Sequence, residues 1–247
     1  MKSAVIVALT AGTVLCAAEG RAQTGWQDRG WLSIDYASQG APTTFSTSTV
    51  FQTNIESGSV STNYPIRRAP LFDVGGGARI WRNLGVGVSV SYTTQDDDAE
   101  VTAKAPHPFF FNQPRTATGS QSVLRQETGV HVQALWMIPA TLHLQIGVFG
   151  GPSFYMAKQG LVTAVNYSES YPFDTATFTN ALTEEQSRNA IGFNAGVDVV
   201  YLFGSRIGVG AIARFSRAQA TFDLVNGGTA PVDIGGVQLG GGLRLRF

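Results

Sequence analysis

The sequence predicts an all-β fold: an eight-stranded, antiparallel, up-and-down transmembrane β-barrel with short periplasmic turns and four long extracellular loops. Three observations predict it. Eight segments alternate between apolar residues and small or polar ones, the connections alternate between short and long, and aromatic residues lie near the segment ends. Alternation with a period of two is typical of strands whose two faces meet different surroundings.

Each segment is recognised by apolar or small residues at every second position. In chain order, the segments span residues 32–36, 72–80, 84–92, 130–136, 142–154, 191–201, 207–215 and 237–247. Their opposite faces carry glycine, serine and isolated charged residues, but no lysine. A face in contact with water would carry more lysine and glutamate. The polar face is therefore expected to fill a narrow lumen and the apolar face to contact lipid, and the last segment is expected to close the barrel by pairing with residues 31–36.

The connections indicate a barrel with two different ends. Tight turns are expected at residues 82–83, 139–141 and 204–206, and long polar stretches lie at residues 38–69, 95–122, 159–188 and 218–233. Long loops without secondary structure are uncommon inside a compact soluble domain. Outer-membrane barrels, in contrast, combine short periplasmic turns with longer extracellular loops.

Aromatic residues on the apolar faces lie near the strand ends and avoid the middles. This placement predicts two aromatic girdles at the membrane interfaces, although aromatic residues also favour strands in general. The outer girdle comprises Tyr36, Phe72, Tyr92, Phe154, Phe193 and Phe215, and the periplasmic girdle comprises Trp136, Tyr201 and Phe247.

The N-terminus is expected to be a secretory signal peptide over residues 1–22, followed by the barrel over residues 23–247. Lys2 provides a positive start, residues 4–18 are apolar or small, and residues 20–22 fit a small-x-small cleavage signal. The alternative is a short membrane anchor, but the apolar run is shorter than the ~20 residues that a spanning helix needs.

Composition excludes several classes of site. The chain has 17 basic and 17 acidic residues, so no nucleic acid is expected as a partner. The single cysteine, Cys16, lies in the signal peptide and follows Leu15, which does not fit a lipoprotein site. The mature chain then has no disulfide, and neither a cofactor nor a metal is expected.

The inward faces predict a polar network along the lumen. A barrel of eight strands is just wide enough for side chains to fill it, and charges in such a tube must pair or reach water. We expect arginines to bridge carboxylates across the lumen and plug it, with a narrow or gated solute path as the alternative. The predicted network comprises Asp35, Asp73, Arg79, Glu127, His131, Asp198, Arg214 and Arg244.

Other polar residues have separate interpretations. His131 is expected to be a hydrogen-bonded filler, the alternative being a pH gate, and His143 is expected to face the lumen lower down. Arg246 lies so close to the periplasmic rim that it is expected to meet water. The acidic run at residues 95–100 is expected to be a solvated loop, the alternative being a divalent-cation site.

With its signal peptide, eight alternating strands and terminal Phe247, the chain resembles the small outer-membrane β-barrel superfamily, in particular the OmpA/OprF-type barrel domain, over residues 31–247. The resemblance implies insertion into the outer membrane of a Gram-negative bacterium, with lipid and lipopolysaccharide as surroundings. It also implies recognition of Phe247 by the barrel-assembly machinery after secretion. A peptidoglycan-binding domain is not expected, so a cell-wall tether is not implied, and the superfamily offers no shared catalytic residues.

Three functions are compatible with this fold. We expect a non-enzymatic, monomeric barrel with a structural or surface-interaction role through its long loops and an extracellular ligand. The second hypothesis is a narrow, porin-like channel for small solutes. The third is a lipid-modifying enzyme, which would need a histidine paired with a serine near lipid. It is disfavoured because His131 and His143 are expected to face away from lipid and His107 lies in a loop.

The loop sequence APHPFFFNQPR, at residues 105–115, has two interpretations. The three adjacent phenylalanines cannot all be buried by one face of a strand. The prolines are expected to fold the loop over the barrel mouth, with the rings packed beneath other loops. The alternative is an exposed apolar contact for a partner or for the lipopolysaccharide layer.

Overall fold

The computed structural model describes residues 26–40, 44–224 and 227–247, so the signal peptide expected over residues 1–22 lies outside the described residues. Within them the chain forms ten β-strands. Their bounds are β1 Gly30–Gly40, β2 Thr44–Thr53, β3 Glu56–Pro65, β4 Ala69–Trp81, β5 Leu84–Ala105, β6 Arg115–Pro139, β7 Leu144–Glu169, β8 Ala176–Leu202, β9 Ile207–Asp223 and β10 Thr229–Arg246. No helix in these ranges is long and apolar enough to cross a membrane.

Eight of the described strands close into an antiparallel barrel, which confirms the predicted fold class. Its order is β1-β4-β5-β6-β7-β8-β9-β10, and β10 pairs back onto β1 as expected, with Leu245 opposite Leu32. Following paired residues from Asp35 in the two directions around the barrel leads to two positions on β8, Ala190 and Val200. This ten-residue stagger accompanies the tilt of strands in a closed barrel.

The expected faces of the barrel strands are confirmed. Side chains such as Leu32, Val88 and Leu243 are about half exposed on the outer wall, while the alternate positions are buried in the lumen. Tight turns join β4 to β5, β6 to β7 and β8 to β9 at one end, which we call the periplasmic end. A continuous apolar outer surface on a barrel without free strand edges suits the interior of a bilayer.

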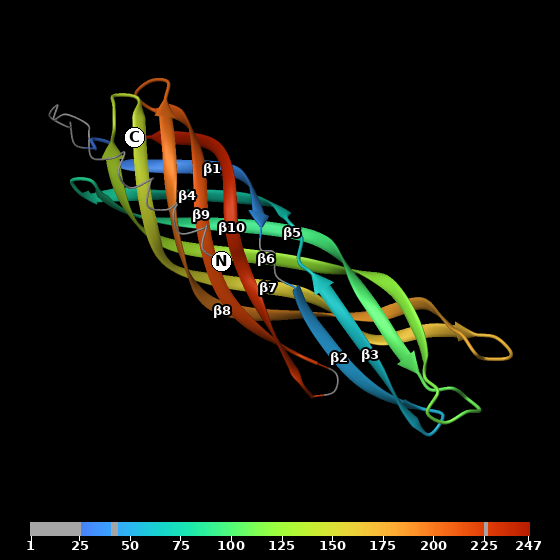
Figure 1. Cartoon of the computed structure of the whole chain (residues 1–247). Coiled ribbons are helices and arrows are strands. Elements are labelled where there is room, and N and C mark those ends of the chain that lie inside the picture. Colours follow the sequence, from blue (N-terminus) through green and yellow to red (C-terminus); the bar gives the residue numbers. More distant parts are fainter. Residues whose placement is uncertain (1–25, 41–43, 225–226) are drawn as a thin grey trace, which may run out of the picture.

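The long polar stretches are largely β-structure rather than irregular loops. Strands β5 to β8 run far beyond the barrel, and β2 and β3 form a hairpin that continues the wall beside β5 (Figure 1). We call this part the outer extension. Short connections remain at 106–114 and 170–175, so much of the sequence expected to form loops instead forms paired strands.

The outer extension has an apolar interior, opposite in polarity to the barrel. On β5, the apolar side chains at even positions 86–92 point outward, whereas Ala99, Val101 and Ala103 at odd positions point inward and are fully buried. The pairing of β5 with β6 has no register shift between Leu84 and Ala105, so the strand is continuous through this change. Apolar side chains therefore exchange faces between the barrel and the outer extension.

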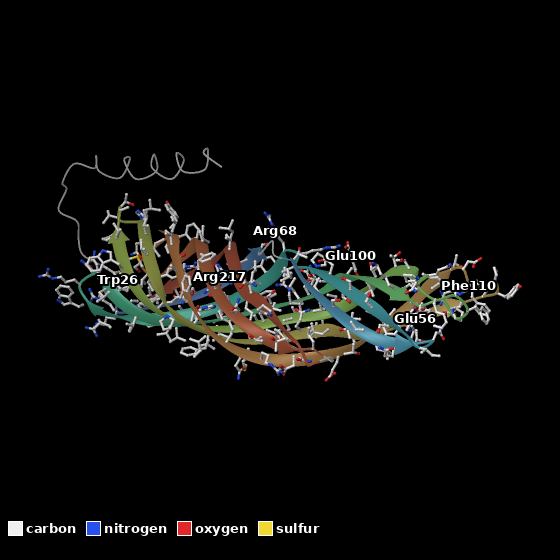
Figure 2. The ribbon with its side chains drawn as sticks, turned by 60° about the horizontal axis from the view of Figure 1, so that its bottom comes forward. Trp26, Glu56, Arg68, Glu100, Phe110 and Arg217 are labelled. Atoms are coloured by element: carbon white, nitrogen blue, oxygen red, sulfur yellow. The ribbon has the colours of Figure 1, made fainter. Side chains whose placement is uncertain are left out.

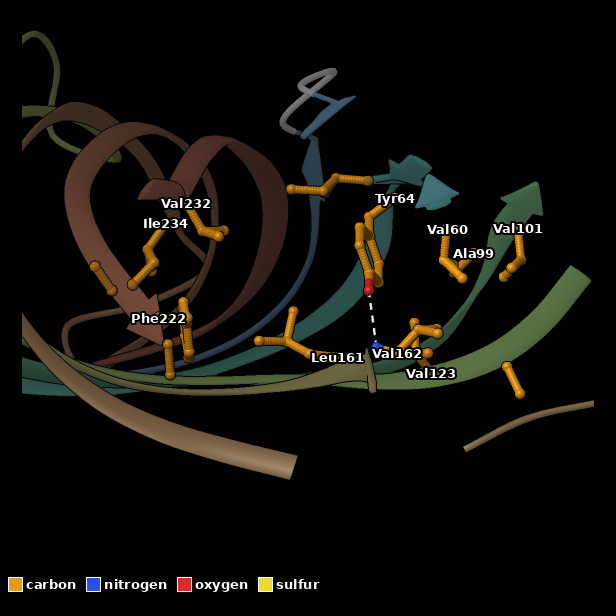
Figure 3. Packing of buried hydrophobic residues seen from close by; sticks show 14 of the residues in the cluster. Val60, Tyr64, Ala99, Val101, Val123, Leu161, Val162, Phe222, Val232 and Ile234 are labelled. Carbon is orange, nitrogen blue, oxygen red and sulfur yellow. Dashed lines mark hydrogen bonds between the residues drawn. The ribbon is translucent and has the colours of Figure 1, made fainter. Parts of the chain in front are cut away.

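Side chains from both sides of the outer extension pack into one core (Figure 3). The ring of Tyr64 on β3 stacks on Phe45 of β2, with centroids 4.4 Å apart. Its hydroxyl accepts a hydrogen bond of 2.8 Å from the backbone N–H of Val162 on β7. Burial raises the pKa of Tyr64 above its usual value. The β2–β3 hairpin is thus fixed to the opposite wall.

Candidate functional site

The centre of the lumen is organised by the guanidinium of Arg214 on β9. It donates to a carboxylate oxygen of Asp73 at 2.7 Å and to the hydroxyl of Ser89 at 3.0 Å, and it also contacts the amide oxygen of Gln238. Arg214 and Asp73 are almost fully buried. Their contact therefore joins β9 to β4 across the lumen through a charge-assisted hydrogen bond away from bulk solvent.

A chain of polar contacts continues from this centre toward the outer end. The amide of Gln238 donates to Gln39 at 2.7 Å, and Gln39 donates to Glu127 at 2.8 Å. Glu127 also accepts from Arg125 at 3.0 Å, and Arg125 lies 3.3 Å from Asp97. We call this set, with Arg214, Asp73 and Ser89, the lumen network.

The sequence analysis missed several members of the lumen network. Gln39, Gln238, Arg125 and Asp97 all lie on inward positions of their strands. Arg125 shares its inward parity with Glu127, so continuing the alternation two residues further would have found it. The acidic run at residues 95–100 is part of β5 rather than a loop, and its Asp97 is buried against Arg125.

A second group of charges lies around Arg244 of β10. Its guanidinium contacts both carboxylate oxygens of Asp198, at 2.6 and 3.0 Å, and one oxygen of Asp35 at 2.7 Å. Arg246, two residues further, is 2% exposed, and its three guanidinium nitrogens have no hydrogen-bond partner among the described residues. Arg246 is therefore buried rather than exposed at the periplasmic rim as expected, and it lines a small cavity together with Leu135 and Phe149.

His131 is fully buried between two serines. Its Nε2 lies 2.9 Å from the hydroxyl of Ser91, its Nδ1 lies 2.8 Å from that of Ser153, and Asn194 donates to Ser153 at 2.9 Å. A histidine beside a serine hydroxyl has the composition of a base and a nucleophile, but this group lacks access to a substrate. It lies inside the barrel wall, where a lipid substrate has no access.

Two further expectations about the lumen need correction or refinement. His143 is exposed in the turn before β7 and stacks against Tyr201, so its expected place in the lumen was wrong. Arg79 is half-buried at the periplasmic end, where it donates to the backbone carbonyl of Trp26. Arg79 therefore helps to seat the segment before β1.

An apolar cluster closes the periplasmic end of the lumen. Trp26 packs with Leu135, Met137 and Phe149, and Trp31 lies against them. Between this cluster and the charged groups is a cavity of about 40 Å³, lined by Arg214, Arg244 and Arg246 among others. Such a volume suits one or a few water molecules, so side chains occupy most of the lumen at this level.

The residues expected to form aromatic girdles all lie on the outer wall. Tyr36, Phe72 and Tyr92 are neighbours across β1, β4 and β5, and the rings of Tyr36 and Phe72 meet edge to face at 5.1 Å. The ring centroids of Phe193 on β8 and Phe215 on β9 are 6.0 Å apart. The remaining side chains, also exposed, are Phe154 of the outer group and Trp136, Tyr201 and Phe247 of the periplasmic group.

A larger cavity lies in the outer extension. It has a volume of about 200 Å³ and is lined by apolar side chains with three threonines, and no charged residue lines it. It shares no lining residue with the lumen cavity. Its walls comprise Thr49, Phe51, Val60, Thr62, Ala103, Val162, Thr163, Ala164, Val165 and Tyr167.

Comparison with known proteins adds to this geometry. The sequence matches no family model and no curated protein. Among solved structures, it is similar to the outer membrane protein OprG from Pseudomonas aeruginosa, with a TM-score of 0.50 and 8% identity over 89% of this chain and 96% of OprG. The fold is thus that of a small outer-membrane β-barrel. The exposed apolar surface of the barrel strands is typical of this fold.

Weaker similarity extends to two other barrels. Neisserial surface protein A gives a TM-score of 0.40 and 13% identity over 88% of this chain and 97% of that protein. The second is Ail, the attachment invasion locus protein of Yersinia pestis, in a complex with the heparin analogue sucrose octasulfate. It gives a TM-score of 0.36 and 13% identity over 87% of this chain and 99% of Ail.

Proposed function

We propose that this chain is a non-enzymatic outer-membrane barrel that acts at the cell surface through its outer extension. The observation that carries the proposal is the filled lumen. The lumen network crosses the barrel, an apolar cluster closes the periplasmic end, and the cavity between them holds about 40 Å³. A solute path would need the arginine–carboxylate contacts to break in a region where charges are buried.

The outer extension supports a role in surface contact. It adds a hairpin and several long strand segments beyond the barrel and has its own apolar core, so it presents ordered surfaces away from the membrane. Binding surfaces on rigid elements lose less conformational entropy on contact than mobile loops do.

Two features argue against lipid-modifying chemistry. His131, which lies between the hydroxyls of Ser91 and Ser153, is buried in the lumen. The next group beyond Ser153 is the amide of Asn194, which donates to that hydroxyl, rather than a carboxylate. His143 is exposed but stacks on Tyr201 in a periplasmic turn. A nucleophile activated by a base must lie within reach of its substrate.

Planar-bilayer recordings test the proposal. The refolded barrel should insert without reproducible open-channel steps, because the side chains of the lumen network and of the apolar cluster around Trp26 lie across the lumen. A general porin inserted under the same conditions is the positive control, and a shift in gel mobility on boiling shows that the tested protein is folded. Reproducible conductance steps from the folded protein would overturn the plugged barrel in favour of a small-solute channel.

A further inference from the structure

Apolar side chains gather where three hairpins end, at the point of the molecule farthest from the periplasmic end. Figure 2 shows Phe110 and Glu56 at one extreme and Trp26 at the other. Two of the hairpin ends hold Ile55, between β2 and β3, and Tyr171, between β7 and β8, which are 93% and 86% exposed. The third holds Phe109, Phe110 and Phe111, which are 55–67% exposed. We call these five side chains the apolar tip.

The backbone that carries the apolar tip is held in place by a buried arginine. Arg115 at the start of β6 donates to the backbone carbonyl of Phe173 at 2.9 Å, to that of Pro106 at 2.8 Å and to Glu169 at 2.7 Å. Its side chain is only 4% exposed. Arg115 therefore ties the β5–β6 connection to the β7–β8 connection.

Further contacts fix the phenylalanine loop and the third hairpin. The ring of His107 accepts hydrogen bonds from the backbone N–H groups of Phe109 and Phe110, at 3.1 and 3.2 Å. The backbone N–H of Asn112 donates to Glu56 of β3 at 2.9 Å. The loop is thus folded, yet its rings remain outside, so the expectation that they pack beneath other loops was wrong.

The chemistry of the apolar tip fits a lipid bilayer better than a folded protein. A stable protein interface uses about 20–30 residues on each side, whereas this tip has five apolar side chains at the end of a long molecule. Ile55 and the three phenylalanines border a hollow of about 140 Å³, which has room for part of a hydrocarbon chain. Large apolar side chains left in water at an ordered site indicate a binding partner.

Charge around the apolar tip indicates which bilayer it would enter. Three carboxylates lie beside the tip. Glu56 accepts from the backbone of Asn112, Glu169 pairs with Arg115, and Asp174 lies 3.6 Å from the ring of His107. The cationic side chains nearby are Arg115 and, on β5, Lys104. The residues of the three connections include no lysine or arginine. Anionic lipid surfaces attract clusters of basic residues, so this acidic surrounding favours a zwitterionic surface.

We propose that the apolar tip inserts into the zwitterionic phospholipid surface of a second membrane, opposite the one that holds the barrel. The tip would thus attach the barrel to that second membrane. The barrel's own membrane lies at the other end of the molecule, out of reach of the tip. The inference rests on the proposed function, because it assigns a partner to the outer extension.

A flotation experiment tests the inference with the whole barrel. The protein is inserted in nanodiscs of phosphatidylglycerol and mixed with free vesicles of phosphatidylcholine. We expect the nanodiscs to float with these vesicles, and the triple variant Phe109→Ser, Phe110→Ser, Phe111→Ser to lose binding at least about tenfold, since insertion depends on burying these rings. The control is Val50→Ser with Leu182→Ser, two exposed apolar side chains away from the tip, and it should bind as the parent does.

The inference would be overturned by no flotation above that of empty nanodiscs, by unchanged binding of the triple variant while its gel shift shows a folded barrel, or by binding to phosphatidylglycerol vesicles alone. Pairing of nanodiscs without vesicles, lost in the triple variant, would instead identify a second copy of the chain as the partner and would also overturn it. Absence of flotation together with silent bilayer recordings leaves the proposed function standing, whereas conductance steps overturn that function whatever the flotation shows.

Discussion

At the scale of single residues, the stability of the lumen depends on buried ion pairs, and loss of one partner alone destabilises the barrel. Arg214 and Asp73 are both buried, so loss of either leaves a charge without water or a partner. Exposed pairs behave differently, because solvent screens them and replaces the lost partner. The chain provides both kinds on neighbouring inward and outward positions of β9.

Replacing Arg214 by alanine should lower the free energy of unfolding by about 3–5 kcal/mol, because Asp73 is left buried and unpaired. Arg217→Ala is the matched control. Arg217 pairs with Asp233 at 3.1 Å but is 59% exposed, so its loss should cost less than about 1 kcal/mol. Urea-driven unfolding of the barrel in vesicles measures both, and equal effects would contradict a structural role for the lumen network.

Glycines beneath Trp31 make a second residue-scale prediction. A Cβ at Gly77 would lie 2.5 Å from the Trp31 ring and 2.2 Å from the backbone oxygen of Val86, and Gly85 and Gly87 face the same ring. Gly77→Ala should therefore destabilise the barrel by about 1–3 kcal/mol through overpacking. Gly204, with no atom within 4 Å of an added Cβ, is the control whose alanine variant should unfold like the parent. The same urea titration compares the two.

At the scale of strands, the alternating pattern predicted the barrel because the face to which each side chain points depends only on its position along the strand, with a period of two. It could not predict which inward groups meet, since Arg214 and Asp73 are 141 positions apart in the chain. It also missed the outer extension. On β5 beyond the barrel, the outward residues are threonine and charged groups and several inward residues are alanine, so this stretch resembles a polar loop by composition. The exchange of apolar residues from even to odd positions along β5 was the available signal.

The contact between β3 and β7 makes a prediction for the outer extension alone. Tyr64→Phe removes the acceptor for the N–H of Val162, which then lies buried without a partner, at a cost of about 1–3 kcal/mol. We expect faster hydrogen exchange at Val162 and faster proteolysis of the β2–β3 hairpin. Exchange in the β1–β10 pair of the barrel should not change. Loosening of both regions together would show that barrel and extension unfold as one unit.

The raised pKa of Tyr64 gives this contact a pH dependence. A tyrosine whose folded pKa exceeds its unfolded value near 10 contributes its full stabilisation below that pH, and the contribution is lost as the pH rises through the folded pKa. The outer extension should therefore become more sensitive to protease above about pH 10. Comparison with Tyr64→Phe at each pH isolates the effect, because the phenylalanine variant lacks this ionisation. The same alkaline loss in both proteins would assign it to other groups.

At the scale of the whole molecule, one continuous wall surrounds interiors of different polarity. The bilayer requires an apolar outside, so the lumen there can hold arginines and carboxylates. Beyond the bilayer the outside meets water, and the same strands turn apolar side chains inward to form a core. The change of polarity, rather than a break in any strand, separates the barrel from the outer extension.

This division predicts that the barrel folds without the far part of β5 and β6. Replacing residues 98–122 by Asn-Gly keeps Asp97 opposite Val123, as in the parent ladder, and supplies a tight hairpin turn. The lumen network, the apolar cluster around Trp26 and the closure of β1 on β10 all remain. The shortened chain should still show a gel shift on boiling and remain silent in planar bilayers. It should also lose flotation with phosphatidylcholine vesicles, because the phenylalanines of the apolar tip are gone. A shortened chain that fails to fold would show instead that the outer extension is needed to assemble the membrane-spanning part.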